Sequence, residues 1–236
     1  MNELSHPILV EFPLEGEWWA PNTPGTKVPS HGTDMLGQRY AYDFVMVDWS
    51  KKKKPFKCNN WQYYVMGIPL PEWYGWGQSV YAPCDGKIIK ATDGISERQR
   101  LHFCTDLFVV LKNSFFGNLD KLNPILGNHI IMQTENAFAF FAHFQKDSIC
   151  VTEGQEVKAG EVLGRVGHSG NSTAPHLHFQ LMDDADILVA KGLPCAFKRF
   201  ERFQDDIWVG VVDGIPTAED RIRGAVKAHT ERGDNE

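Results

Sequence analysis

Closely spaced glycines in the second half of the chain constrain its fold most strongly. Gly154, Gly160, Gly164, Gly167 and Gly170 leave only short segments between them, and tight turns between strands favour glycine. Short runs of alternating or continuous apolar residues occur along the chain at 17–20, 40–47, 80–82, 87–89, 129–133, 138–144, 162–166 and 177–182. Runs of this length, bounded by turn residues, predict a mainly β fold of short antiparallel strands.

Three stretches receive their own predictions. Asp85-Gly86 lies between the runs at 80–82 and 87–89 and predicts a strand, a turn and a second strand. Apolar residues recur every three or four positions between about 97 and 116, as in an amphipathic helix. After Asp183 we expect the strands to give way to a mixed tail, with 217–236 helical or frayed.

Composition excludes several classes of protein. Hydrophobic residues make up 42% of the 236 positions and charged residues 23%, which is ordinary for a soluble globular protein. The net charge of −6 argues against a nucleic-acid binder with a broad basic surface. No apolar run is long enough for an integral membrane segment. The five cysteines are odd in number and form no CxxC pair, so we expect reduced thiols.

The strongest local signal for chemistry is the sequence PHLHF at 175–179. Successive side chains of a strand point to opposite faces, so His176 and His178 share one face, while Leu177 and Phe179 share the other. Two imidazoles on one face can serve a metal, one as a ligand and one as a neighbouring acid or base. The alternative is a pair of solvent-facing histidines on an edge strand.

Further donors lie upstream. His31 and Asp43 offer an imidazole and a carboxylate, and a catalytic zinc usually takes three protein ligands and leaves its fourth position to water. Asp43 lies in an apolar strand, where burial of an unpaired carboxylate is costly; an Asp paired with an Arg or a Tyr is the alternative. His143 lies in the apolar run FFAHF, and a hydrogen-bonded core histidine is its simpler interpretation.

Several segments together resemble one family. The sequence GHSGNSTAPHLHF at 167–179 is similar to the C-terminal signature of the lysostaphin-type zinc endopeptidases, which cut peptide cross-links in bacterial cell walls. Residues 80–88, 127–131, 141–144 and 151–167 also resemble that family. The likeness runs from about residue 31 to residue 182.

The resemblance implies that Asp43 and His178 bind Zn²⁺ and that His143 and His176 act beside the bound water and the developing oxyanion. The first ligand departs from the family pattern, because Arg39 occupies its usual position four residues before Asp43. His31 is the nearest upstream substitute, and the alternative is a degenerate, metal-free site.

The other histidines have weaker contexts. His129 and His168 lie at positions where the family does not use histidine, so we expect neither to be a ligand. For the three remaining histidines we expect surface or structural roles; they are His6, His102 and His229.

We therefore expect a two-layer antiparallel β-sandwich-like peptidase domain. A single domain over 1–236 would hold a core at about 28–185, insertions at about 49–76 and 94–126, and a C-terminal extension at 186–236. Five aromatic residues crowd the first insertion, where packing is favoured over a substrate platform: Trp61, Tyr63, Trp73, Tyr74 and Trp76.

The favoured function is a zinc metalloendopeptidase acting on peptidoglycan cross-links or related short peptides. No HExxH or GxSxG motif offers another catalytic centre. One alternative is an inactive binding or regulatory module on the same fold. A weaker one is a lipoyl-like or phosphocarrier domain, suggested by the glycine-rich segment 151–167. The N-terminus shows no secretory signal, whereas the family usually acts outside the cytoplasm.

Overall fold

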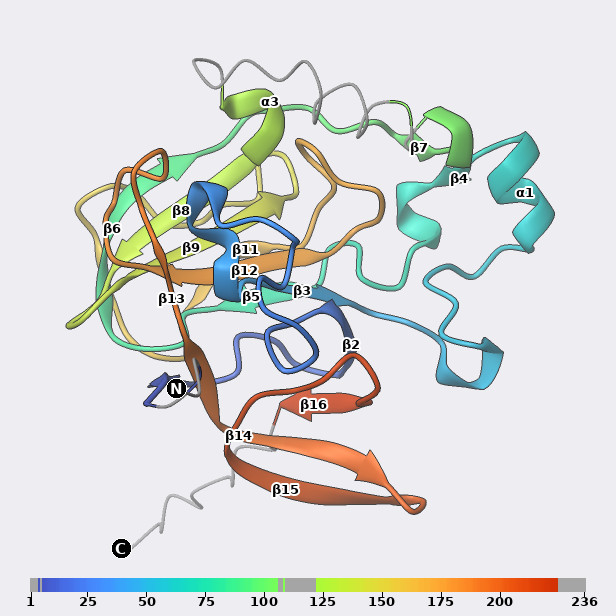
Figure 1. The fold of residues 1–236 in the computed structure, drawn as a ribbon. Coiled ribbons are helices and arrows are strands. Elements are labelled where there is room, and N and C mark those ends of the chain that lie inside the picture. The colour runs from blue at the N-terminus through green and yellow to red at the C-terminus, as the bar shows by residue number, and fades with distance from the viewer. Residues whose placement is uncertain (1–3, 5, 106–107, 109–121, 225–236) are drawn as a thin grey trace, which may run out of the picture.

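The structure is a computed structural model that describes residues 4, 6–105, 108 and 122–224. Strands dominate these residues, so the predicted mainly β fold is confirmed (Figure 1). Among the described helices, none is long and apolar enough to cross a membrane.

The strands are β1 (Ile8–Val10), β2 (Glu17–Asn22), β3 (Tyr42–Val45), β4 (Ile68–Pro69), β5 (Ser79–Tyr81), β6 (Gly86–Thr92), β7 (Arg100–Leu101), β8 (Asn128–Gln133), β9 (Phe138–Phe144), β10 (Glu156–Val157), β11 (Val162–Arg165), β12 (Leu177–Met182), β13 (Gly192–Leu193), β14 (Cys195–Gln204), β15 (Ile207–Gly214) and β16 (Ile222–Gly224). The helices are the α-helices α1 (Asn60–Val65) and α3 (Asn123–Leu126) and the 3₁₀ helices η1 (Met35–Tyr40), η2 (Trp49–Lys51) and η3 (Leu70–Glu72).

One large sheet organises the molecule. Its strands follow the order β1-β14-β16-β2-β3-β12-β9-β8-β6-β10, with β13 added beside β12 and β15 beside β14. The pairings are antiparallel except for β1 with β14. Strand β12 is central, since it lies between β3 and β9.

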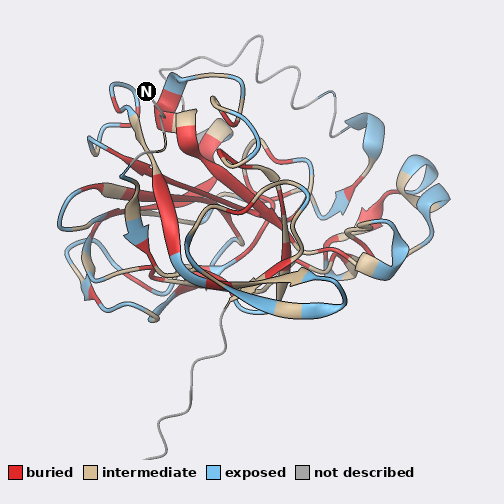
Figure 2. Cartoon of the chain, turned by 60° about the horizontal axis from the view of Figure 1, so that its bottom comes forward, coloured by how far each residue is buried: buried red, intermediate tan, exposed pale blue. Residues whose placement is uncertain are grey.

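The two faces of the central strands differ in character. Phe141 of β9 and Phe179 of β12 are fully buried on one face, and the β5–β11 pair packs against it through Val80 and Leu163. These large apolar side chains belong to the main core, and Figure 2 shows the buried residues of the central strands in red. The opposite face of β12 carries His178, as strict alternation predicts.

The region around α1 has a small core of its own. Phe56, Ile68, Leu70, Trp73 and Leu101 form it, and it contacts Ala174 of the loop before β12. Packing was the favoured role for the aromatic residues here, and Trp73 is buried accordingly. Trp61 differs, because 55% of its surface is exposed.

The helix predicted between about 97 and 116 is wrong at its start. Residues 97–102 are not helical, because Leu101 enters the small core and pairs with Ile68 of β4. Residues 103–105 and 108 are helical, and the rest of the predicted helix lies outside the described residues. The two strands predicted around Asp85-Gly86 are present as β5 and β6, but they do not pair with each other: β5 pairs with β11, and β6 pairs with β8 and β10.

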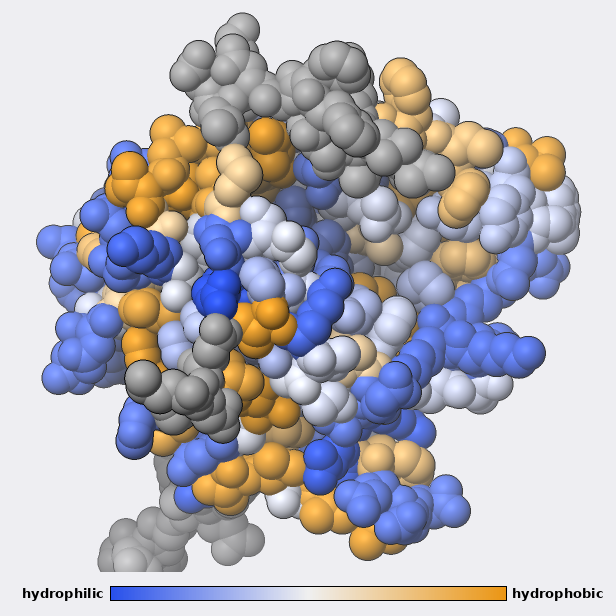
Figure 3. Space-filling model, in the orientation of Figure 1, coloured by the Kyte–Doolittle hydropathy of each residue, from blue (hydrophilic) through white to orange (hydrophobic). Residues whose placement is uncertain are grey.

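The prediction for the C-terminal part is also wrong. Strands continue after Asp183, and β14, β15 and β16 join the large sheet. Asp205 and Asp206 both have positive φ and connect β14 to β15, as a tight hairpin turn requires. Ile222 of β16 is fully buried against the core, so this region is part of the fold; residues 225–236 lie outside the described part. The exposed hydrophobic residues of the β14–β15 hairpin lie at the bottom of Figure 3.

Candidate active site

Pairing of β3 with β12 sets Asp43 directly opposite His178. Both side chains are buried and leave the sheet on the face away from the main core, and Asp43 Oδ1 lies 2.9 Å from His178 Nδ1. The register of two neighbouring strands therefore brings together residues 135 positions apart in the sequence.

His31 reaches the same place from a loop. The backbone N–H of Ser30 donates to the carbonyl of Arg39 at 2.9 Å, and the Ser30 hydroxyl donates to the carbonyl of Gln38 at 3.2 Å. These bonds fold the loop back over β3, and His31 Nε2 lies 2.9 Å from Asp43 Oδ2. Arg39 instead forms an ion pair with Asp34 at 2.6 Å.

A bulge directs His143 into the cluster. Alternation along β9 places Phe140 and Ala142 on the site face, so His143 should point to the main core. Its φ of +68° and a register shift between β8 and β9 change that direction, as bulges do beside active sites. The His143 ring lies 4.7 Å from the His176 ring, centroid to centroid.

The hydrogen bonds define which ring nitrogens are free. Nδ1–H of His143 donates to the carbonyl of Ser169 at 2.8 Å, and Nδ1–H of His176 donates to the carbonyl of Ala174 at 2.7 Å, because a carbonyl can only accept. In their neutral forms both rings therefore have an unprotonated Nε2. His176 Nε2 lies 3.5 Å from Asp43 Oδ1.

The hydrogen-bond partners of His31 and His178 determine whether a cation fits beside Asp43. Gln180 donates to the carbonyl of Leu36, so its Oε1 accepts from His178 Nε2–H at 2.9 Å. The Ser30 hydroxyl has donated its hydrogen to Gln38, so it accepts from His31 Nδ1–H. Neutral His31 and His178 then present lone pairs to the Asp43 carboxylate.

Three acceptor atoms thus converge within 4.8 Å of one another. Their mutual repulsion is relieved by extra protons or by one cation. Two imidazoles and one carboxylate are typical zinc ligands, so the chemistry of these residues fits Zn²⁺.

Burial and neighbouring charge shift the pKa values of this group. Burial raises the pKa of Asp43, but the imidazoles of His176 and His31 outweigh it and hold that pKa well below its ordinary value. Burial, with His176 and His178 nearby, holds the pKa of His143 well below 6.5. Burial also disfavours charge on His176, yet the Asp43 carboxylate outweighs burial and raises its pKa. Asp43 is therefore an anion and His143 a neutral base at neutral pH.

The cluster opens into a cavity of about 290 Å³. Its walls include all five residues singled out from the sequence, together with others: Asn22, His31, Gln38, Asp43, Ile125, Leu126, Phe140, Ala142, His143, Asn171, Thr173, His176, His178 and Gln180. Asn22 and Gln180 were not predicted. Asn22 donates to Asp43 Oδ2 at 2.7 Å, and only the Gln180 position, two residues after His178 on the same face, was open to prediction.

The remaining described histidines are not part of the group of three acceptor atoms. His129 and His168 are buried outside that group, and His6 is exposed. His102 lies after β7, where its Nδ1 is buried. His229 lies outside the described residues.

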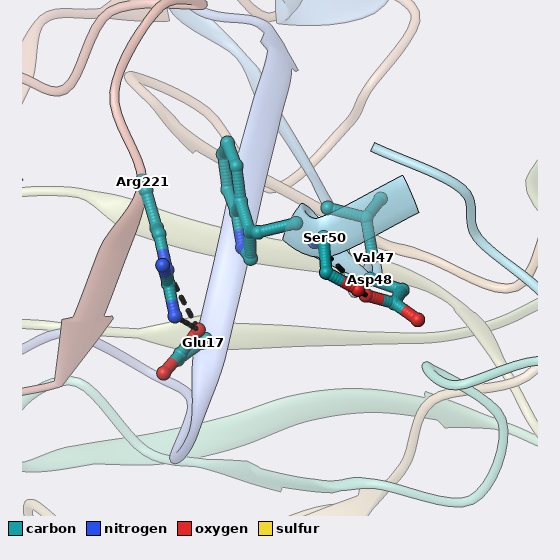
Figure 4. Close-up of a pocket in the computed structure, with 6 residues that line it drawn as sticks. Glu17, Val47, Asp48, Ser50 and Arg221 are labelled. Atoms are coloured by element: carbon teal, nitrogen blue, oxygen red, sulfur yellow. Dashed lines mark hydrogen bonds and ion pairs between the residues drawn. The ribbon is translucent and has the colours of Figure 1, made fainter. Parts of the chain in front are cut away.

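A second cavity, of about 390 Å³, lies at the other end of β2 (Figure 4). Its charged side chains are paired: Arg221 bonds Glu17 at 2.8 Å, and Asp48 accepts from Ser50 at 2.6 Å and pairs with Lys51 at 3.2 Å. Hydrophilic residues gather over the neighbouring η2 segment in Figure 3.

Comparisons with known proteins agree with the motifs. Residues 109–188 match the model of peptidase family M23. The chain is 36% identical over 65 residues to the peptidoglycan DD-endopeptidase ShyA of Vibrio cholerae. This match covers 27% of this chain and 15% of ShyA. The chain is 46% identical over 46 residues to the glycyl-glycine endopeptidase ALE-1 of Staphylococcus capitis, covering 20% of this chain and 12% of ALE-1.

Among solved structures, the catalytic domain of lysostaphin from Staphylococcus simulans is similar at 22% identity and a TM-score of 0.36, over 75% of this chain and 88% of that one. The chain spans less than a fifth of the length of the curated relatives it matches. The match of residues 109–188 to the model of peptidase family M23 confirms the resemblance to lysostaphin-type peptidases carried by the sequence motifs.

Proposed function

We propose that the protein is a zinc-dependent endopeptidase that hydrolyses peptide bonds in peptidoglycan cross-links or related short peptides. The observation that carries the proposal is the convergence of His31, Asp43 and His178, whose acceptor atoms lie within 4.8 Å of one another beside a cavity. The names of the relatives ShyA and ALE-1 support the substrate class.

His31, Asp43 and His178 would hold the metal. A zinc ion there would supply Lewis-acid chemistry, which lowers the pKa of water and polarises a carbonyl oxygen. Asn22 and Gln180 hold the Asp43 carboxylate and the His178 ring in place, as partners of ligating groups commonly do.

His143 and His176 would handle the protons. His143 presents an unprotonated Nε2, since its Nδ1–H is bound to Ser169, and its lowered pKa keeps it neutral. It is therefore suited to accept a proton from attacking water. His176 has a raised pKa and takes up a proton more readily, so it is suited to donate to the developing oxyanion or to the leaving amine.

The main alternative is a binding or regulatory module without metal, for which Arg39 in the usual ligand position was the argument. Arg39 bonds Asp34, while His31 contacts Asp43. This arrangement favours the enzyme, because the missing donor is replaced from the preceding loop.

We also propose that residues 1–236 form a single domain with its peptidase core at about 28–185. Strands β1 and β2 precede that core and β14 and β16 follow it, yet all four belong to the same sheet as its strands, which supports one structural unit.

The test is hydrolysis by the purified, zinc-loaded chain. Peptidoglycan fragments with defined cross-links and the matching free peptides are incubated with the protein, and new amino termini are identified by mass spectrometry. We expect cleavage that a chelator abolishes and added zinc restores. A folded, zinc-loaded protein that cleaves none of these substrates would contradict the proposal.

A further inference from the structure

A chain of hydrogen bonds leads away from His176 into the protein. Ser172 Oγ lies 3.1 Å from His176 Nδ1 and 3.1 Å from His168 Nδ1, and His168 Nε2 lies 2.8 Å from a terminal nitrogen of Arg98. Ser172 and His168 are buried. His168 is not one of the three proposed ligands, as expected from the sequence, and it takes no part in the proposed proton transfers.

The direction of every bond in this chain is determined. A guanidinium can only donate, so His168 Nε2 accepts from Arg98 and the neutral ring carries its hydrogen on Nδ1. The Ser172 hydroxyl donates to the carbonyl of Ala174 at 2.7 Å. Its oxygen must therefore accept from His168 Nδ1–H and, as a second contact, from His176 Nδ1–H.

Arg98 and Glu97 both contact the loop between β11 and β12, which carries His168, Ser172 and His176. The same Arg98 nitrogen that meets His168 also donates to the carbonyl of Ser172 at 2.9 Å. Glu97, itself buried, accepts from the backbone N–H groups of Lys146 and His168. Both residues belong to the segment between β6 and β7, within the predicted insertion at 94–126, so this segment fixes the loop that carries His176.

We propose that Arg98, His168 and Ser172 are positioning residues that act together with the Ala174 carbonyl to hold His176 in its Nδ1–H tautomer and so keep its Nε2 directed into the cavity. The catalytic consequence rests on the proposed function, whereas the tautomer of His176 can be measured without it. If Ser172 were free to rotate, its hydroxyl could leave Ala174 and donate to His176 Nδ1, which would favour the opposite tautomer.

The first readout is nuclear magnetic resonance of the full chain labelled with ¹⁵N-histidine. Two-bond proton–nitrogen correlations in alkaline buffer report which ring nitrogen carries the hydrogen. In the wild type we expect Nδ1–H on both His168 and His176. His168→Phe removes the contact between His168 Nδ1 and the Ser172 hydroxyl. We therefore expect His176 to populate both tautomers, or its Nδ1–H to exchange with water at least about tenfold faster.

Conservative variants separate positioning from packing. In His168→Asn the amide nitrogen takes the place of Nδ1 and can still donate to Ser172, whereas in His168→Gln the amide replaces Nε2 and retains only the link to Arg98. We expect Asn to restore the His176 signals and Gln to leave them perturbed. Arg98→Met breaks the far end of the chain and serves if His168→Phe does not fold.

His129→Phe is the matched control, because His129 is also buried and its Nδ1, within the described part of the chain, bonds only the carbonyl of Gly127. It should leave His176 unchanged. In peptide cleavage we expect His168→Phe to lower kcat about 10- to 100-fold with KM and zinc content nearly unchanged.

An unaltered His176 tautomer and exchange rate in both His168→Phe and Arg98→Met would overturn the proposal. So would an equal perturbation by His129→Phe. If the wild type cleaves no peptide, the proposed function fails, and the resonance measurement still decides whether the chain positions His176.

Discussion

The cavities at the two ends of β2 differ in how their carboxylates are paired. At one end, Glu17 meets Arg221 and Asp48 meets Lys51, so each carboxylate has its own cation. At the other end, Asn22 borders a cavity where one carboxylate, Asp43, faces His31, His176 and His178, with acceptor atoms turned toward one another. In the first cavity the protein's own cations neutralise both carboxylates. In the second, a bound cation would relieve the repulsion between the acceptor atoms.

Replacing the carboxylate of Asp43 by an amide has the largest expected effect on activity. Asp43→Asn removes the negative ligand, so we expect zinc binding to fall and peptide cleavage to drop to the uncatalysed background. Metal analysis and a cleavage assay on the folded variant check this. Cleavage near the wild-type rate would show that Asp43 is no ligand.

A second prediction concerns His143. His143→Asn keeps a side-chain N–H for Ser169 and tolerates the positive φ, but it lacks the unprotonated Nε2. We expect kcat to fall about 10²- to 10⁴-fold, while zinc stays bound. Loss of zinc in this variant would instead make His143 a ligand.

The buried His168 predicts that the free energy of unfolding depends on pH. Burial, with Arg98 and His176 nearby, lowers the pKa of His168 to about 3. Below pH 6.5 the unfolded chain therefore binds a proton that the folded chain refuses, so stability falls as the pH drops toward 3. The metal-free wild type should lose up to about 1.4 kcal/mol per pH unit from this residue.

Denaturant unfolding across that window measures the slope. In His168→Asn the slope should be smaller between pH 6.5 and pH 4.5, and the two proteins should have equal slopes above pH 7.5. Equal slopes throughout would mean that His168 is not held neutral in the folded chain.

The smallest effect is expected at the paired end. Glu17→Gln breaks a half-exposed ion pair with Arg221, which typically contributes at most about 1 kcal/mol to the free energy of unfolding. Cleavage should be unchanged, because the pair lies outside the catalytic cavity. A loss of activity here would show that the two ends are coupled.

Alternation explains how much of the site was predictable. It placed His178 on one face of a strand and Phe179 on the other, and the structure agrees. For His143 alternation alone is misleading, because the bulge at this residue reverses its direction; only the family resemblance indicated its place. The loop that carries His31 depends on Ser30 bonding the backbone of residues 38 and 39, and these contacts across eight and nine positions have no periodic signature.

The C-terminal part was more predictable than our interpretation allowed. Residues 195–204 and 207–214 flank Asp205 and Asp206, and this pattern is typical of a hairpin. The exposed charged residues Lys198 and Arg199 interrupt the apolar pattern between Phe197 and Phe200, which are both buried. The helix predicted from residue 97 is absent at its start, because Leu101 pairs with Ile68 of β4 instead.

Zinc stoichiometry in His31→Ala and Arg39→Ala, measured beside the wild type by elemental mass spectrometry after zinc loading and dialysis, tests the central claim most directly. We predict one zinc per chain in the wild type and in Arg39→Ala, and clear loss in His31→Ala. A wild type without zinc, or full zinc retention in His31→Ala, would contradict the account.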